Sequence, residues 1–594
     1  MLRKVHIPER HYNNWSWFDG LTLEMVDCSL NPLELKLFSD DIIEITDNSN
    51  ENINNIQQQQ IETQHVKLIH SSLRQMTNIP GILYVTGKTY GRYKNKKLYQ
   101  CIPDDKRLPI FLIPYENKKD TFEKCLVNYY VTFSFVEWND KHPIGKLTNN
   151  IGSVETLTHF YEYQLYCKSL NATIQDFTKK TIDALKQRTE EEYIQLILKE
   201  HPNIEDRTND YIISIDPPKS LDIDDAFGIQ RINDHEYKLS IYIANVAVWI
   251  DTLSLWNSFS ERVSTIYLPD RKRPMLPNIL SDCLCSLQEK SKRFAYYLDF
   301  IINECENEQQ VIGGAITNIS SISNVSFGIA MINVHKNYRY EEKSLLNDLN
   351  YINAFNLIQN LCKHVKIISS VKDSHDLINY LMVLMNSTCA EKMMEFKDGI
   401  YRSVTLNNKR DIPDNIPEDV NKFLKLWSCS SGQYSTFSDQ QGHILVREGV
   451  ESYIHISSPI RRLVDLLNSI KLQTLMGIYT FTQDAHDFYN KWFNRLEYIN
   501  TTMRAIRKVQ TDCSILNMVN QNPNLLSNEY DGYVFDKIKR NDGLFQYIVY
   551  LHHLKILSRI TTRNDLENYE CIKFKIFVFN DESTLKKKIR LHVI

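Results

Sequence analysis

The chain has 594 residues, of which 24% are charged and 42% hydrophobic, and its formal net charge is −4. A single hydrophobic core does not grow to this length, so roughly three to five domains are expected. The sequence lacks a run of about eighteen apolar residues, which excludes a typical membrane-spanning helix. A charge near zero also excludes nucleic-acid binding through overall charge, so any such binding requires local basic patches.

The cysteines and the first residues bear on the cellular compartment. The twelve cysteines include no CxxC pair, and only Cys283 and Cys285 lie close together. This spacing argues against a structural zinc site and for reduced thiols. The opening MLRKVHIPERHYNNW lacks the apolar centre of a secretory signal. We therefore predict a cytoplasmic, monomeric protein that does not associate with membranes.

Residues 1–150 are dominated by short apolar or alternating runs, which predict small antiparallel β-barrels. These runs are LELKLFSDDIIEI, GILYVTG, KLYQCI, PIFLIPY and LVNYYVTFSFVEW. Residues 46–62 hold nine Asn or Gln in seventeen positions, a composition that predicts a loop. Helical patterns follow in ETLTHFYEYQLYCKSL and QDFTKKTIDALKQR.

The second half of the chain alternates between helical and strand patterns. Residues 350–400 carry apolar residues at three- and four-residue spacing and are predicted to be mainly helical. A further helix is expected through PIRRLVDLLNSIKLQTLMGI, beginning at Pro459, because proline suits a first helical turn. Another is expected through HDFYNKWFNRLEYINTTMRAIRKVQ, and the last segment has the strand pattern of a five-stranded barrel.

The C-terminal segment is locally basic. Residues 536–594 contain twelve Lys or Arg and seven Asp or Glu, a local net charge of +5. Such a run is more often a solvated face than a binding surface. The basic tail by itself therefore does not assign a partner.

Four aspartates fall within ten positions of the stretch ISIDPPKSLDIDDAF; they are Asp216, Asp222, Asp224 and Asp225. Strand patterns flank them, YIISI before and YKLSIYIANVAVWI after. Burying a carboxylate without a partner costs several kcal/mol, so the apolar neighbours predict a bound cation. Hard divalent cations such as Mg²⁺ take carboxylate ligands, and two such ions can activate water at a phosphodiester. An EF-hand is excluded, because its glycine and twelfth-position glutamate are absent.

A second feature is SSPIRRLVDLL at 457–467, which places Arg461 and Arg462 near an expected helix N-terminus. The backbone N–H groups and the dipole at such an end favour anions. Arginine adds bidentate contact with phosphate. Adjacent surface arginines are common, but together with an acidic metal site they would complement a phosphodiester.

Three segments resemble, in order and spacing, the catalytic domain of the ribonuclease II, ribonuclease R and exosome-nuclease (RNB) family. They are IDPPKSLDIDDAF, STIYLPDRKRPMLPNILSDCLCSL and YIHISSPIRRLVDLL. FSFVEWNDKHPIGKLTNNIG resembles the second cold-shock domain of the exosome-type members, and DGYVFDKIKRNDGLFQYIVYL resembles their terminal OB-type barrel more loosely.

The resemblance implies a multidomain α+β fold. The expected parts are a cold-shock-like segment at 1–75 that includes the 46–62 loop, a second cold-shock-like OB domain at 76–169, a mixed α+β RNB catalytic domain at 170–520, and an OB-type RNA-binding domain at 521–594.

The resemblance also implies an activity. The family consists of processive, hydrolytic 3′→5′ exoribonucleases that act on single-stranded RNA through a two-metal mechanism and release nucleoside 5′-monophosphates. The implied cofactor is Mg²⁺, with Mn²⁺ as an alternative. The implied metal ligands are Asp216, Asp222, Asp224 and Asp225, with Asp224 organising the second metal and the attacking water. Arg461 would hold the scissile phosphate and offset charge in the transition state.

The residues implied to bind substrate are Tyr267, Phe327 and Arg462. An aromatic ring that stacks on a base tolerates any sequence, since every base has a π-face. The family usually has a tyrosine where Phe327 stands, and acidic residues where Asn379 and Tyr380 stand, one turn beyond Asp376. These departures leave the four aspartates and Arg461 unchanged.

Two alternatives remain open at this point. One is a catalytically silent RNA-binding or assembly protein that keeps the nuclease fold, which the three departures motivate. The other is a metal-dependent phosphodiesterase that acts on DNA. Retention of all four aspartates favours an active nuclease, because a metal-free acid cluster is destabilising once its function is lost.

Overall fold

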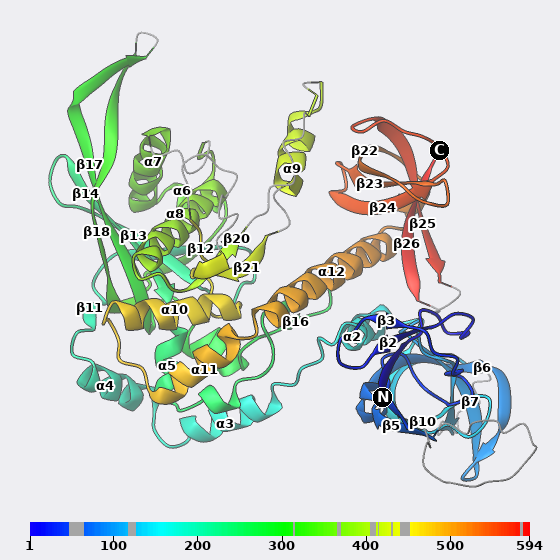
Figure 1. Ribbon diagram of the computed structural model, residues 1–594. Coiled ribbons are helices and arrows are strands. Elements are labelled where there is room, and N and C mark those ends of the chain that lie inside the picture. Colours follow the sequence, from blue (N-terminus) through cyan, green and yellow to red (C-terminus); the bar gives the residue numbers. More distant parts are fainter. Residues whose placement is uncertain are drawn as a thin grey trace, which may run out of the picture. The chain divides into compact units, whose positions relative to one another are not determined.

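The computed structural model describes residues 1–46, 65–116, 126–312, 315–364, 370–403, 412–413, 415–428, 432–439, 452–581 and 586–594. Apart from its first residue, the Asn- and Gln-rich segment 46–62 lies outside the described residues. The chain divides into two compact units, one made of Met1–Asn171 with Val509–Ile594 and the other of Ala172–Lys508. The first unit therefore contains both ends of the described chain (Figure 1).

Two β structures form the N-terminal part of the first unit, which confirms the strand-rich prediction for residues 1–150. One is a five-stranded sheet of order β3-β2-β1-β4-β5, and the other is a closed barrel of order β10-β8-β7-β6-β9. Their strands are β1 Leu2–His6, β2 Ser16–Asp19, β3 Met25–Val26, β4 Ile42–Thr46, β5 His65–His70, β6 Ile79–Tyr93, β7 Lys96–Pro103, β8 Phe111–Tyr115, β9 Tyr129–Glu137 and β10 Ile144–Ser153. They share one core, in which Phe38 and Phe111 stack with ring centroids 6.0 Å apart.

The remainder of the first unit consists of short helices and the C-terminal sheet. Helix α1 spans Ser72–Gln75, and α2 spans Leu157–Cys167 and stacks Tyr163 on Tyr130 of the barrel at 4.5 Å. The C-terminal strands form a five-stranded sheet of order β24-β23-β22-β25-β26. They are β22 Glu529–Lys539, β23 Phe545–Leu551, β24 Ile556–Thr562, β25 Cys571–Asn580 and β26 Lys587–Val593.

The second unit is organised around a seven-stranded mixed sheet of order β11-β18-β17-β14-β13-β12-β19. Its strands are β11 Glu205–Arg207, β12 Ile212–Asp216, β13 Asp225–Arg231, β14 Glu236–Ala244, β17 Lys292–Ile312, β18 Ala315–Asn333 and β19 Lys336–Arg339. The two edge strands pair in parallel with their neighbours, and the inner strands pair antiparallel. The two-stranded pairs β15 Ile266–Tyr267 with β16 Lys272–Arg273 and β20 Ile400–Ser403 with β21 Gln433–Thr436 complete the strands of this unit.

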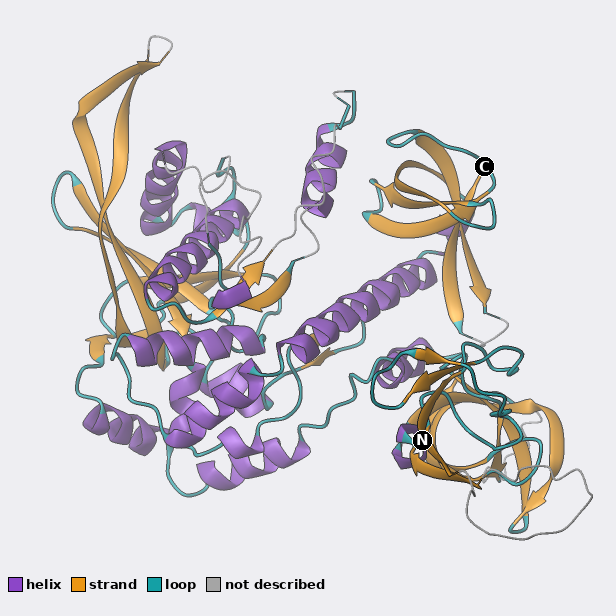
Figure 2. Ribbon diagram, in the orientation of Figure 1, coloured by secondary structure: helices purple, strands orange, loops and turns teal. Residues whose placement is uncertain are grey.

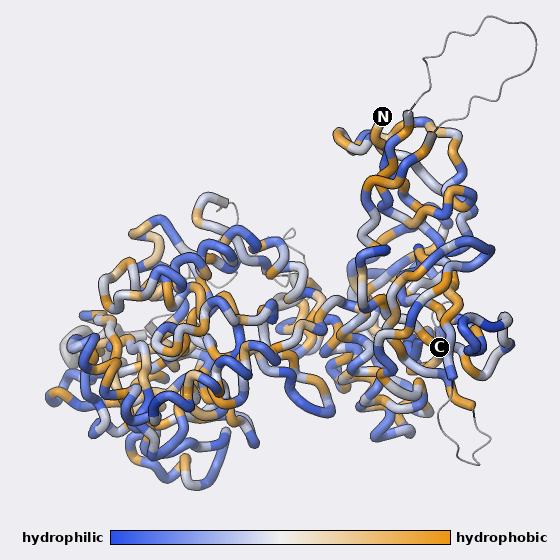
Figure 3. The backbone as a smooth tube through the Cα atoms, turned by 90° about the horizontal axis from the view of Figure 1, so that it is seen from below, coloured by the Kyte–Doolittle hydropathy of each residue, from blue (hydrophilic) through white to orange (hydrophobic). Residues whose placement is uncertain are grey.

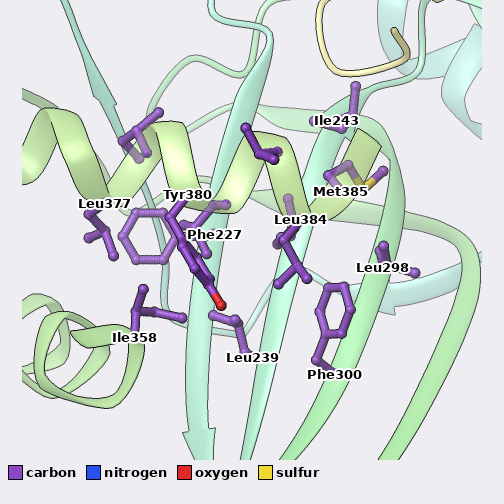
Figure 4. Packing of buried hydrophobic residues seen from close by; sticks show 14 of the residues in the cluster. Phe227, Leu239, Ile243, Leu298, Phe300, Ile358, Leu377, Tyr380, Leu384 and Met385 are labelled. Carbon is purple, nitrogen blue, oxygen red and sulfur yellow. The ribbon is translucent and has the colours of Figure 1, made fainter. Parts of the chain in front are cut away.

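Two helices, α7 Leu349–His364 and α8 Ser374–Glu395, contribute buried residues to the same core as this sheet. Figure 4 shows Tyr380 and Leu384 of α8 directed at Phe227 and Leu239 of the strands. Each fully buried side chain of this size contributes about 1.5–3 kcal/mol through removal of apolar surface from water. This packing fixes α8 against the seven-stranded sheet. The aspartates lie in the same sheet, at the end of β12 and the start of β13.

Figure 2 shows the remaining described helices in purple. They are α3 Gln175–Leu185, α4 Glu190–Glu200, α5 Val246–Thr252, α6 Lys343–Leu346, α9 Glu418–Ser428, α10 Leu463–Leu475, α11 Gln483–Phe493 and α12 Leu496–Gln521, with short turns η1 Trp256–Ser258, η2 Ile279–Leu284, η3 Phe437–Asp439 and η4 Pro523–Leu526. The helices predicted at 350–400 and across HDFYNKWFNRLEYINTTMRAIRKVQ are confirmed.

One strand prediction is wrong in part. The run YKLSIYIANVAVWI is a strand only as far as Ala244, and Val246 begins helix α5. The last five residues of the run, 246–250, are all buried and apolar, so they carry no periodicity that distinguishes a strand from a helix.

Hydrophobic and hydrophilic stretches alternate along the coloured, described part of the tube in Figure 3, without one long apolar run there. Correspondingly, no helix in the described part of the chain combines the length and the apolar character needed to cross a membrane.

Candidate active site

A cavity of about 630 Å³ opens in the second unit and brings together most of the residues singled out from the sequence. The predicted residues on its wall are Asp216, Asp222, Asp224, Asp225, Tyr267, Arg461 and Arg462. The aspartates and the two arginines among them are more than two hundred residues apart in the chain. Phe327 is not on this wall.

The aspartates are placed by two adjacent strands and the loop between them. Asp216 is the last residue of β12 and Asp225 the first of β13. The intervening loop is held at its far end, where the Ser286 hydroxyl donates to the Leu221 carbonyl and accepts from the Ile223 N–H, at 2.7 and 3.0 Å. These bonds fix the carboxylates before any ligand arrives, which is the preorganisation that an electrostatic site requires.

Arg461 is placed by a turn rather than by a helix, which corrects the prediction of a helix from Pro459. Helix α10 begins at Leu463, and residues 461–463 instead bond to a neighbouring segment. The Thr265 N–H donates to the Arg461 carbonyl at 2.9 Å, and the Leu463 N–H donates to the Val263 carbonyl at 2.9 Å. These long-range bonds replace the first helical turn, a tertiary effect that helix propensity does not include.

Asp224 and Arg461 form the central pair of the site. Arg461 Nε donates to Asp224 Oδ2 at 2.9 Å, and the Ile460 N–H donates to Oδ1 at 2.9 Å. Asp224 is 3% exposed, and burial raises its pKa to about 7 although Arg461 partly offsets that effect. The carboxylate is therefore oriented through both oxygens, and further positive charge nearby would favour its ionised form.

Asp216 and Asp225 face the cavity with little compensation from the protein. The Ser214 hydroxyl donates to Asp216 Oδ2 at 2.8 Å, and burial raises the pKa of Asp216 to about 6. Burial and the neighbouring Asp216 and Asp224 raise the pKa of Asp225 well above its usual range. No described donor reaches the Asp225 carboxylate. Open, crowded carboxylate oxygens of this kind are the ligand set that Mg²⁺ or Mn²⁺ takes, so the residues fit such a cation.

Asp222 differs because a charged side chain of the protein, that of Lys272, already pairs with it. Lys272 Nζ donates to Asp222 Oδ1 at 3.0 Å and to Asp282 Oδ1 at 2.8 Å. Although burial opposes it, the two carboxylates raise the pKa of Lys272, which stays charged. The Tyr267 hydroxyl donates to the second oxygen of Asp222 at 2.9 Å.

The residues where the chain departs from the family pattern lie off the cavity wall. Phe327 packs against the core of the second unit, with its ring centroid 6.4 Å from that of Tyr296. Tyr380 is fully buried in the same core (Figure 4). Asp376 is occupied at the start of α8, where it accepts the Lys372 N–H at 3.1 Å. The substrate role of Phe327 therefore stays a prediction without a contact to support it.

Helix α8 instead faces the cavity with Ile378, Met382 and Asn386, spaced four residues apart. Asn386 donates to the Tyr453 hydroxyl at 2.9 Å and accepts the Ile456 N–H at 3.1 Å, which ties α8 to the segment before Arg461. Their four-residue spacing indicates that these three residues share one face of the helix. The sequence does not indicate that this face is the one at the cavity, because that depends on packing.

Two further wall residues were missed from the sequence. Tyr340 lies beyond β19, and burial together with Asp225 and Asp216 raises its pKa to about 12. Lys272 carried no signal, because a lysine within RKR resembles an exposed charge run. Both reach the aspartates only through the folding of separate strands.

Comparison with known proteins identifies part of the second unit. Residues 204–350 match the family model described as RNB domain. Over 214 residues the chain is 32% identical to ribonuclease R of Ureaplasma parvum serovar 3, a match that covers 35% of this chain and 27% of that protein. The chain spans about a quarter to a half of the length of the curated relatives that it matches.

Solved structures share the fold. The apo form of Mycoplasma genitalium RNase R aligns with a TM-score of 0.67 at 16% identity, covering 100% of both chains. Yeast Ssd1, described as a pseudonuclease, aligns with a TM-score of 0.58 at 13% identity, covering 100% of this chain and 82% of Ssd1. These likenesses establish a multidomain α+β fold of the RNase R type, and they occur with a nuclease and with a pseudonuclease alike. Residues 204–350 are thus similar to the RNB domain, and the fold of the chain is similar to that of RNase R.

Proposed function

We propose that the chain is a metal-dependent hydrolytic exoribonuclease that shortens single-stranded RNA from its 3′ end and releases nucleoside 5′-monophosphates processively. The observation that carries the proposal is the Asp224–Arg461 pair, which sets a guanidinium beside the open carboxylates of Asp216 and Asp225. A bound Mg²⁺ or Mn²⁺ would lower the pKa of water and stabilise the leaving oxygen. Asp216, Asp224 and Asp225 are the residues that would hold it.

Arg461 supplies the positive charge on the substrate side. Its Nε is engaged by Asp224 and its Nη2 donates to the Ser458 hydroxyl at 2.9 Å, while no described acceptor contacts Nη1. That nitrogen is left for a phosphate oxygen. Because two bonds already fix the guanidinium, little conformational entropy is lost when it binds the phosphate.

Tyr267 extends the wall toward the substrate. Its side chain is 42% exposed while its hydroxyl is anchored on Asp222. An exposed ring held at one end offers a stacking face for a nucleobase and tolerates any sequence. This arrangement suits the 3′ end of an unpaired strand more than a paired one, because stacking needs an accessible base face.

The test is incubation of the chain with single-stranded RNA labelled at its 5′ end, in the presence of Mg²⁺. With RNA in excess, the full-length strand is expected to give way to a short 5′-labelled end product with few intermediates. An even ladder of intermediates would contradict processivity, and an immediate labelled mononucleotide would contradict the 3′→5′ direction. Asp224→Asn is expected to abolish shortening, whereas the matched control Asp234→Asn, at an exposed surface position, keeps it. A DNA strand of the same sequence tests the preference for ribose.

A catalytically silent RNA-binding protein is the second candidate. The observation that favours it is the side of α8 that faces the cavity, where Ile378 and Met382 offer apolar side chains and no carboxylate. This candidate predicts RNA that is bound but stays intact at every Mg²⁺ or Mn²⁺ concentration. Loss of binding to the labelled strand in Arg461→Gln, without any cleavage by the unaltered chain, would support it over the nuclease.

A further inference from the structure

Lys272 lies between two carboxylates at one side of the aspartate cluster. Its Nζ donates to Asp222 Oδ1 at 3.0 Å and to Asp282 Oδ1 at 2.8 Å. The two carboxylates come from separate segments, the aspartate loop and the turn η2. Carboxylate oxygens from two segments that converge on one positive charge form the kind of ligand set that a divalent cation takes. In this chain an ammonium nitrogen has the cation's position.

The β15–β16 pair positions this lysine. Lys272 and Tyr267 are directly opposed in the antiparallel pair, and directly opposed residues have their side chains on one face. Both side chains accordingly reach Asp222, and the Tyr267 hydroxyl donates to its Oδ2 at 2.9 Å. The neighbouring Arg273 makes two bonds to Asp270, at 2.6 and 2.8 Å, which hold the turn between the strands. The backbone of β16 therefore carries the ammonium group to the aspartate loop.

The contacts of Lys272 are partly shielded from water. The exposed fraction is 22% for the side chain of Lys272, 10% for that of Asp222 and 14% for that of Asp282. Exposed ion pairs are screened and weak, whereas breaking a shielded pair leaves each partner with an uncompensated charge. A second cation at Asp222 must therefore displace the ammonium group or lie beside it, and like charges a few ångströms apart repel.

Asp224 also has a positive side chain of the protein beside it. Arg461 Nε donates to Asp224 Oδ2 at 2.9 Å. Within the described part of the chain, no lysine or arginine forms an ion pair with Asp216 or Asp225. One or two carboxylates, completed by water and substrate phosphate oxygens, are a usual ligand set for a single Mg²⁺. The unpaired carboxylates therefore account for one ion, and the paired ones leave no equivalent place for another.

We propose that the site takes one divalent cation, held by Asp216, Asp224 and Asp225, and that Lys272 occupies the position of a second. The inference rests on the proposed nuclease function and deepens it, because the family resemblance implies two metal ions. The single cation supplies the activation of water. The positive charge that a second ion would bring to Asp222 is supplied by the ammonium group.

The test counts the Mn²⁺ ions that the RNA-free full chain binds in calorimetric titration. The variant Asp216→Asn/Asp222→Asn/Asp225→Asn gives the ions bound elsewhere, which are subtracted. One ion is expected at the cluster of the unaltered chain, and this count needs no further variant. Lys272→Ala is expected to bind two, because Asp222 and Asp282 then face a space that a hydrated ion can enter. Lys272→Ser is a second variant with the same expected count.

Two further variants control the count. Lys272→Ala/Asp222→Asn is expected to return to one ion, which assigns the additional ion to Asp222. Lys491→Ala removes a surface lysine paired with Glu261 at 3.1 Å and is expected to stay at one ion, as the matched control.

The outcomes separate this inference from the proposed function, because the count uses no RNA. Two ions at the cluster of the unaltered chain overturn the inference, and so does a single ion in both Lys272→Ala and Lys272→Ser. One ion without any shortening of RNA contradicts the nuclease function alone, and two ions with shortening contradict the inference alone. Absence of Mn²⁺ from the cluster contradicts both.

Discussion

The two sides of the aspartate cluster are compensated in different ways. Asp222 lies against a charged lysine and a tyrosine hydroxyl, both supplied by the β15–β16 pair. Asp216 and Asp225 lie at the ends of β12 and β13 and receive one hydroxyl between them. Asp224 stands between the two cases, with one guanidinium and one backbone N–H.

This difference shows that four aspartates in one motif need not be equivalent as metal ligands. A divalent cation binds most strongly where negative charge is least compensated. In this chain that place is the Asp216–Asp225 side, since Lys272 already neutralises Asp222. The prediction that all four aspartates bind metal can therefore be tested one side at a time.

The largest expected effect separates the two sides directly. Asp225→Asn removes an uncompensated ligand and is expected to lower the rate of RNA shortening by about 10³-fold or more. Asp222→Asn leaves Lys272 paired with Asp282 and is expected to cost only about tenfold. Single-turnover rates with 5′-labelled RNA measure both. Equal losses would mean that Lys272 moves aside and that Asp222 is a full ligand.

Arg461→Lys is the next largest change. Lysine keeps the charge but cannot donate to Asp224 while also offering a second nitrogen to phosphate, so the rate is expected to fall about 10²-fold. RNA affinity, measured by filter binding, is expected to change less than the rate. Arg231→Lys, at an exposed arginine, is the control. A rate within threefold of the unaltered chain would remove Arg461 from the transition state.

The pH dependence of stability tests the uncompensated side without substrate. The pKa values of Asp216 and Asp224 are about 6 and about 7 in the folded, metal-free chain and about 4 when unfolded. Between about pH 4 and 7 the folded state holds protons that the unfolded state has released, so stability falls as pH rises.

The expected size of this effect is about 4 kcal/mol in the free energy of unfolding between pH 5 and 8, the sum of the two carboxylates. Urea unfolding in EDTA measures it, and saturating Mg²⁺ is expected to reduce the fall, because the cation binds the ionised carboxylates of the folded state. Groups elsewhere in the chain titrate alike with and without the cation and cancel in the comparison. Identical pH profiles with and without Mg²⁺ would contradict a cation site at these residues.

The sequence predicted the parts of this site that are continuous in the chain. The aspartate loop and the arginine pair are short motifs in which residue type and spacing already carry the chemistry. Lys272 and Tyr340 were not predicted, because each is an ordinary residue until β16 and the turn after β19 approach the aspartates. Three-dimensional proximity of this kind leaves no local pattern to read.

The same limit applies to the fold. Alternating and three- to four-residue patterns predicted most strands and helices, since each element's buried face is periodic. Of the predicted barrels, β6–β10 form a closed one, whereas β1–β5 and β22–β26 form five-stranded sheets. The predicted start of α10 was wrong because bonds to Val263 and Thr265 hold residues 461 and 462 out of the helix, which begins at Leu463. The turn into α5 was missed because a wholly buried run has no polar face.

Lys272→Met tests the Asp222 side of the cluster by removing the positive charge that pairs with this carboxylate. The methionine has similar length and no charge, so Asp222 regains its full negative charge beside the other carboxylates. The affinity for Mn²⁺, measured by calorimetry on the RNA-free chain, is expected to rise about tenfold, in line with the interaction of unit charges a few ångströms apart at a protein surface. Lys219→Met, at the exposed loop on the same wall, is the control. Weaker Mn²⁺ binding in Lys272→Met would show that the lysine orders the ligands rather than competing with the cation.

Tyr267→Phe is expected to have the smallest effect. The change removes the hydrogen bond to Asp222 but keeps the ring, and Lys272 still holds the carboxylate. If the ring stacks on the terminal base, the rate falls no more than about threefold, because the lost neutral-to-charged hydrogen bond is partly replaced by water. Tyr267→Ala removes the ring as well and is expected to weaken RNA binding about tenfold or more, the range of one base–aromatic stack. Equal effects of the two substitutions would mean that Tyr267 acts through its hydroxyl, by positioning Asp222. Its ring would then not stack on the RNA.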